Sequence, residues 1–252
     1  MKVKACYEYV NDLPHEITLG ELAETTREKP LLSVYSQGKA EWIGFGGAFT
    51  ESSAYCYAQM SEKDKQSTLE ALFGESGLRY QFCRLCIGSS DFALDEFCYV
   101  EENDYDLRTF SIERDRKYVI PFVKDAIRHS KRELLLFASP WSPPAFMKEN
   151  GTRFSGGKLK KDCYALYAEY IVRFLQAYCE EGIRIFALTL QNEPKAAQTW
   201  ESCFYTVEDE IAFVPYLRGA LDANGFGEVK LLCWDHNKER LYERADRIFT
   251  AC

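Results

Sequence analysis

The chain has 252 residues, 46% of them hydrophobic and 28% charged, which is enough for one large or two small globular domains. Its net charge of −8 argues against nucleic acid or an anionic membrane as a partner. No run approaches the about 18 apolar residues of a membrane helix, and the first 16 residues are too polar for a signal peptide. With its ten cysteines interpreted as reduced, the protein is expected to be cytoplasmic, without an integral membrane segment.

Short apolar runs alternate with longer amphipathic ones from residue 42 onward. In chain order they predict strand 42–45, helix 62–73, strand 80–87, helix 116–130, strand 134–138, helix 162–181, strand 183–190, helix 207–223, strand 229–234 and helix 238–249. This alternation predicts an α/β fold, with a parallel sheet and helices outside it.

Residues 1–41 have a different pattern. Apolar runs at 31–36 and 39–42, on either side of Gln37-Gly38, predict a hairpin. We therefore expect a separate N-terminal β segment at 1–41, followed by the strand–helix units of 42–252.

Five strand–helix units leave two architectures open. One is an open doubly wound sheet, and the other is a (β/α)₈ TIM barrel of which this chain supplies about five units. In both, the active site lies at the carboxyl ends of the strands. The dinucleotide reading is weak, because Phe49 stands where the last glycine of a G-x-G-x-x-G motif belongs.

The fourth predicted strand ends in Gln191-Asn192-Glu193-Pro194. A glutamate at the end of a buried strand is partly desolvated, which favours its protonated form, as a general acid for glycosidic oxygen requires. Asn192 beside it could bind a sugar 2-hydroxyl. The alternative is that Glu193 only caps a loop.

Other strand ends carry residues suited to a sugar pocket, whose walls combine planar aromatic rings with hydroxyl-binding carboxylates. They are Arg84 in the second strand and Asp91 after it, Trp141 after the third strand, and Asp235 after the fifth. Each alone is more often structural, and only their convergence indicates a site. The three histidines show no metal spacing, so neither a metal nor a cofactor is expected.

The sequence resembles glycoside hydrolase family 30, the glucosylceramidase-like family. The segments that carry the resemblance are Gly44-Phe-Gly-Gly-Ala-Phe-Thr-Glu51, 84–92, Ser139-Pro-Trp-Ser-Pro-Pro, Thr189-Leu-Gln-Asn-Glu-Pro194, Gln198-Thr-Trp-Glu-Ser-Cys203 and Leu232-Cys-Trp-Asp-His-Asn237. The resemblance implies a (β/α)₈ barrel with a side β-sandwich that includes residues 1–41. It also implies retaining hydrolysis by two glutamates.

The resemblance gives the site residues their roles. Glu193 would be the acid/base, and Arg84, Asp91, Trp141 and Asn192 would hold the glycone, with Asp235 as a further rim residue. No residue of this chain matches the family's nucleophilic glutamate, so the chain is expected to be truncated and inactive alone.

The expected substrate is a β-linked glycoside or glycolipid. Glucosylceramide is the family's best-known substrate, while β-1,6-glucans and β-xylosides stay open. The alternative function is a non-catalytic, sugar-binding half-barrel.

Overall fold

The computed structural model describes residues 6–10, 13–17 and 43–252. The chain divides into two compact units, Met1–Trp42 and Ile43–Cys252, which are described separately. In the first unit, strands β1 (Cys6–Val10) and β2 (Leu13–Ile17) form an antiparallel pair. The hairpin predicted at 31–42 lies outside the described residues. That this unit belongs to a side β-sandwich stays a prediction.

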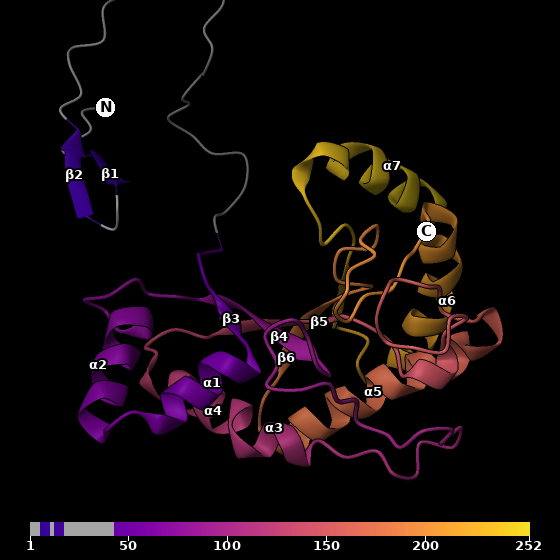
Figure 1. Cartoon of the computed structure of the whole chain (residues 1–252), viewed down its shortest axis with the longest axis horizontal. Coiled ribbons are helices and arrows are strands. Elements are labelled where there is room, and N and C mark those ends of the chain that lie inside the picture. Colours follow the sequence, from indigo (N-terminus) through magenta and orange to yellow (C-terminus); the bar gives the residue numbers. More distant parts are fainter. Residues whose placement is uncertain (1–5, 11–12, 18–42) are drawn as a thin grey trace, which may run out of the picture. The chain divides into compact units, whose positions relative to one another are not determined.

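The second unit is built on a five-stranded parallel sheet (Figure 1). Its strands are β3 (Ala48–Phe49), β4 (Phe82–Ile87), β5 (Leu135–Pro140), β6 (Ile185–Thr189) and β7 (Lys230–Leu232). Its helices are α1 (Glu51–Gln59), α2 (Glu62–Phe73), α3 (Glu113–Lys117), α4 (Val119–His129), α5 (Tyr164–Glu180), α6 (Val207–Ala223) and α7 (Leu241–Ala251). Short 3₁₀ turns lie at Ala145–Met147, Lys161–Cys163 and Lys238–Arg240.

The strands are paired in chain order, β3-β4-β5-β6-β7. A doubly wound sheet would reverse its strand order at a switch point, whereas a barrel adds each strand beside the last. In Figure 1, α1 to α5 lie along one side of the strands. The described residues therefore form five of the eight strands of a (β/α)₈ barrel, which decides between the two architectures left open by the sequence.

The first strand of the sheet differs from the prediction. It is the two-residue β3, with Ala48 opposite Arg84 of β4, and not the apolar run at 42–45. Gly46 explains part of the shift, because a Cβ there would lie 1.7 Å from the carbonyl oxygen of Phe82. The chain runs tight against β4 before β3, since the Phe45 carbonyl already accepts from the N–H groups of Gln81 and Phe82. Phe49 then enters the core with 3% of its surface exposed.

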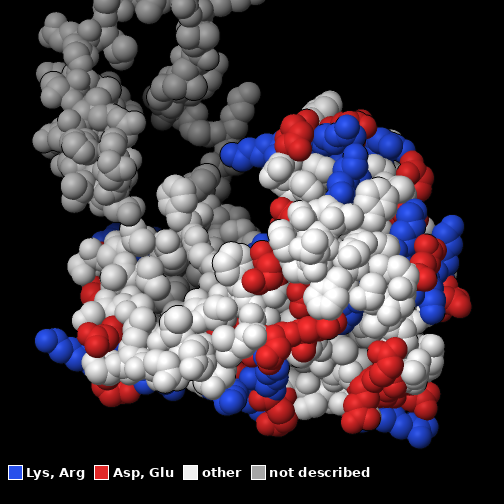
Figure 2. Space-filling view, in the orientation of Figure 1, with Lys and Arg blue, Asp and Glu red and all other residues white. Residues whose placement is uncertain are grey.

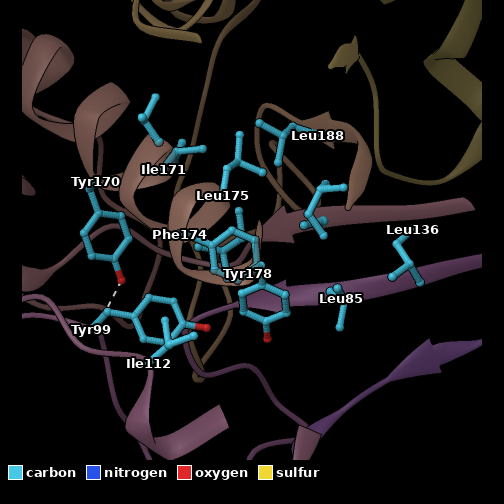
Figure 3. Close-up of a cluster of buried hydrophobic side chains, with 14 of the residues drawn as sticks. Leu85, Tyr99, Ile112, Leu136, Tyr170, Ile171, Phe174, Leu175, Tyr178 and Leu188 are labelled. Atoms are coloured by element: carbon cyan, nitrogen blue, oxygen red, sulfur yellow. Dashed lines mark hydrogen bonds between the residues drawn. The ribbon is translucent and has the colours of Figure 1, made fainter. Parts of the chain in front are cut away.

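Alternation along β4 separates core from site. Leu85 is fully buried, while its neighbour Arg84 is only partly buried. Successive side chains of a strand point to opposite faces, so Leu85 faces the helices and Arg84 the barrel interior. Figure 3 shows Leu85 in the core on the helix side, together with Leu136 of β5 and the rings of Phe174 and Tyr178 from α5.

One carboxyl group lies inside this core. Asp115 of α3 accepts hydrogen bonds from the hydroxyls of Tyr99, at 2.6 Å, and Tyr178, at 2.8 Å. Burial raises the pKa of Asp115 to about 6.

The surface in Figure 2 carries Lys and Arg interspersed with Asp and Glu, separated by a broad uncharged area. Among the described residues, no helix is both long and apolar enough to cross a membrane.

Candidate active site

The backbone of the Asn192-Glu193 pair is fixed between two neighbouring strand ends. The Asn192 N–H donates to the carbonyl of Pro140 at 2.8 Å, and the Glu193 N–H donates to the carbonyl of Asp235 at 2.7 Å. Glu193 has a positive φ of 43°, a conformation that non-glycine residues rarely adopt and that clusters at functional sites. The turn after β6 is therefore held by its neighbours in a strained geometry.

The Glu193 carboxyl group is half-buried and makes no hydrogen bond or ion pair with any of residues 43–252. A loop cap would use its carboxyl oxygens on nearby backbone N–H groups. This carboxyl does not, so its oxygens are available to a bound ligand.

Arg84 is the centre of the polar network beneath Glu193. Its guanidinium contacts the Asp235 carboxylate, donates to Asn192 Oδ1 at 2.7 Å, and donates to Ser139 Oγ at 2.9 Å. The same Asp235 oxygen, Oδ2, accepts from Ser139 Oγ at 2.8 Å and from Thr189 Oγ1 at 3.0 Å. Residues from all of β4, β5, β6 and the segment after β7 are thereby tied together at one edge of the sheet.

This network orients the Asn192 amide. Its carbonyl oxygen faces Arg84, so its NH₂ group points elsewhere and makes no hydrogen bond within the described part of the chain. An amide NH₂ donates hydrogen bonds, and a sugar hydroxyl accepts them. Asn192 therefore presents a donor beside the free carboxyl of Glu193.

Trp141 supports the site instead of forming an open platform. Its ring is only 6% exposed, and the Arg84 guanidinium lies 4.4 Å from the ring centroid. Its indole N–H donates to Asp91 Oδ1 at 3.0 Å. Asp91 itself is exposed, so its second oxygen remains available to a ligand. Trp141 thus positions Arg84 and Asp91.

The structure places five of the six residues expected from the sequence after the carboxyl ends of strands, while Arg84 lies within β4 and reaches this edge with its side chain. Arg84, Asn192 and Asp235 are joined by direct hydrogen bonds, as are Asp91 and Trp141. Three further polar residues were missed: Ser139, Thr189 and Gln191. The sequence signal that could have found these three residues is a polar residue inside or just after a buried apolar strand. Between residues 43 and 252, no three His, Cys, Asp or Glu side chains are placed to hold a metal ion.

Residues 43–252 match the family model described as the glycosyl hydrolase family 30 TIM-barrel domain. The chain is 37% identical to "Putative glucosylceramidase 3" of Caenorhabditis elegans, covering 82% of this chain and 42% of the relative. It is 32% identical to the lysosomal acid glucosylceramidase of Mus musculus, covering 88% of this chain and 46% of that relative. The chain thus spans less than half the length of these relatives.

Two solved structures have the same arrangement. SrfJ from Salmonella typhimurium matches with a TM-score of 0.79 and 42% identity, over 82% of this chain and 47% of that one. An endo-β1,6-glucanase matches with a TM-score of 0.75 and 29% identity, over 82% of this chain and 48% of that one. By its sequence, strand order and strand-end residues, this chain belongs to glycoside hydrolase family 30.

Proposed function

We propose that this chain forms the acid/base half of a retaining β-glycosidase site, with Glu193 as the general acid/base. The observation that carries the proposal is the Glu193 carboxyl: fixed by its backbone, half-buried, without a partner, and next to the oriented amide of Asn192. In the first step Glu193 protonates the leaving oxygen, and in the second it takes a proton from the attacking water.

A retaining mechanism also requires a carboxylate nucleophile about 5–5.5 Å from the acid/base. Asp235 is a poor candidate, because its Oδ2 accepts from Arg84, Ser139 and Thr189 and its negative charge is neutralised by Arg84. The Asp91 carboxylate accepts from Trp141 through Oδ1, and we assign its other oxygen to a sugar hydroxyl. We therefore propose that the nucleophile of the whole protein lies outside residues 43–252, and that this chain alone is inactive.

The proposed substrate is a β-glucoside. Relatives are named as glucosylceramidases, and a solved structure as an endo-β1,6-glucanase, so β-linked glucose is common to both. Asp91, Asn192 and Arg84 supply the acceptor and donors that glucose hydroxyls need. Glucosylceramide and β-1,6-linked glucose differ in the aglycone, and comparing their turnover separates them.

The proposed location is the cytoplasm. Nine cysteines between residues 43 and 252 are free thiols, which suits a reducing compartment. One relative is named as lysosomal, so cell fractionation with an antibody against this chain is the deciding measurement.

A second candidate function is sugar binding without catalysis. It is favoured by the network of Arg84, Asn192 and Asp235, which is complete within this chain. Hydrolysis by a completed barrel, with none by Glu193→Gln, supports the enzyme. Sugar binding without hydrolysis by that same barrel supports the binding protein.

The test is a chimera that joins residues 43–252 to the unmatched part of the endo-β1,6-glucanase barrel. We expect it to hydrolyse gentiobiose or glucosylceramide, and expect Glu193→Gln to lose this activity at an unchanged melting temperature. Equal turnover by the two folded proteins would contradict the proposed role of Glu193.

A further inference from the structure

Behind the candidate site lies a lysine that neither catalysis nor sugar contact requires. Lys148 follows the 3₁₀ turn at Ala145–Met147 and is fully buried. Its ammonium donates to Ser142 Oγ at 3.0 Å, to the carbonyl of Ser202 at 2.6 Å, and to the carbonyl of Arg153 at 3.2 Å. All three of its donors are used, each on a different part of the loops after β5 and β6.

We infer that Lys148 is a positioning residue, whose buried ammonium holds the loop carrying Trp141 against the loop carrying Ser202. This inference rests on the proposed function, because it gives Lys148 a role in the same sugar site. Ser142, which Lys148 contacts, directly follows Trp141 in the chain.

The charge on Lys148 is buried without a counter-ion among residues 43–252. No carboxylate of the described residues lies within ion-pair distance of its ammonium. Burial lowers the pKa of Lys148 to about 8, and the titratable and charged groups that act on it are the neutral thiol of Cys203 and the guanidinium of Arg153. An apolar side chain of the same length would avoid this desolvation penalty but would leave the carbonyl oxygens of Arg153 and Ser202 without the donor that Lys148 provides. The ammonium holds Ser142 Oγ and the carbonyl oxygens of Arg153 and Ser202 at fixed positions relative to one another.

A second buried cation holds the loop on the other side of the site. Arg153 donates to Ser89 Oγ at 2.6 Å and contacts the carbonyl of Phe97. Ser89 also contacts the buried carboxylate of Glu201, and it lies two residues before Asp91. Lys148 and Arg153 therefore hold, through Ser142 and Ser89, the two segments that the Trp141–Asp91 hydrogen bond joins.

Releasing the Lys148 anchor has a defined consequence. The segment at Ser142 can shift, and Trp141 with it. Asp91 then loses its indole donor, now at 3.0 Å, and Arg84 loses the ring that lies 4.4 Å from its guanidinium. Sugar binding should weaken even when the chain stays folded.

The experiment uses the chain with Lys148→Met, which keeps a stem of similar length without a donor. The matched control is Lys158→Met on the same loop, where the lysine is 38% exposed and pairs with Asp209. The first readout is hydrogen exchange of the Trp141 indole N–H, assigned with Trp141→Phe. We expect a tenfold or greater loss of protection in Lys148→Met and less than twofold change in Lys158→Met.

The second readout is the affinity for phenyl β-D-glucoside, a neutral probe, measured by NMR titration. We expect at least tenfold weaker binding by Lys148→Met. We also expect wild-type affinity to fall as the pH rises through about 8, where Lys148 loses its proton, with no such fall in the variant. Unchanged indole protection in a folded Lys148→Met chain would overturn the inference.

Two further outcomes are distinguishable. If Lys148→Met unfolds, the second variant is Ser142→Ala, which removes only one of the three contacts of Lys148. We expect Ser142→Ala to lower the protection of the Trp141 indole N–H at least threefold. Unchanged protection in Ser142→Ala would then overturn the inference. If the wild-type chain binds no sugar, the affinity measurement is made in the chimeric barrel, where the proposed function is tested, while the exchange measurement still decides the role of Lys148.

Discussion

The backbone N–H of Glu193 donates a hydrogen bond to the carbonyl oxygen of Asp235 at 2.7 Å. The main chain of Glu193, the proposed acid/base, is thus fixed to the segment after the next strand. Its carboxyl group makes no hydrogen bond or ion pair with the residues that the structure describes. The Asp235 side chain meanwhile anchors Arg84. One residue therefore holds the position of Glu193 with its backbone and that of Arg84 with its side chain.

The first prediction concerns this anchor. Asp235→Ala removes the shared acceptor of Arg84, Ser139 and Thr189, in a pair whose side chains are only 21% and 19% exposed. We expect a loss of about 2–3 kcal/mol in the free energy of unfolding, measured in urea. Asp235→Asn retains an acceptor oxygen and should lose about half as much. A change below about 0.5 kcal/mol in Asp235→Ala would show that the network does not stabilise the sheet edge.

The second prediction concerns the close approach of the chain before β3. In Gly46→Ala the new Cβ would meet the Phe82 carbonyl oxygen at 1.7 Å, so the backbone must move, and we expect a loss of about 2 kcal/mol or more. Gly219→Ala in α6 meets nothing within 4 Å and should stabilise by about 0.5–1 kcal/mol, because alanine favours a helix over glycine. Thermal unfolding of the two variants checks the predicted loss of stability in Gly46→Ala and the predicted gain in Gly219→Ala. A Gly46→Ala chain as stable as wild type would place the first strand elsewhere.

The third prediction is a pH dependence. Burial raises the pKa of Asp115 from 3.8 to about 6, so the folded state binds its proton more tightly than the unfolded state. The stabilisation from protonated Asp115 is full below about pH 4 and is lost as the pH rises through about 6, by on the order of 2–3 kcal/mol.

Asp115→Asn removes that titration. Relative to wild type, the variant should gain stability on going from pH 4 to pH 7.5, as measured by urea unfolding at both pH values. The difference between the two proteins isolates Asp115 from carboxyls that titrate in the opposite sense, such as Glu70, whose pKa is lowered to about 2 by hydrogen bonds from Ser76 and His129. A pH-independent difference would contradict the assignment.

Much of the fold follows from the sequence, because its central strands are long, apolar and flanked by strong helices. The structure has strands at β4, β5 and β6, within a few residues of the predicted ranges. The first strand was misplaced because the apolar run at 42–45 is a local signal, whereas the pairing of Ala48 with Arg84 is set by tertiary contacts. Helix α1 was missed because its apolar residues form no marked stripe along one face, and its capping box at Thr50 and Ser53 was the available signal.

The candidate site was predictable as a set of strand-end residues, since the strand ends of a parallel sheet meet at one edge. The contacts within the set were not. Trp141 was expected to offer its face to a sugar, but the structure buries the ring against Arg84, which no spacing in the sequence reveals. Ser139 and Thr189 went unnoticed because hydroxyl residues are common at strand ends, and only their shared contact with Asp235 distinguishes them.

The most direct test of the account is the leaving-group dependence of Glu193→Gln in the chimeric barrel. General acid catalysis by Glu193 predicts a fall in kcat/KM of about 10²–10⁴-fold for methyl β-glucoside, whose leaving group needs a proton. For 2,4-dinitrophenyl β-glucoside, whose leaving group needs none, the cleavage step should change by less than about tenfold. Equal losses for both substrates, or no loss for either, would contradict the assignment of Glu193 as the acid.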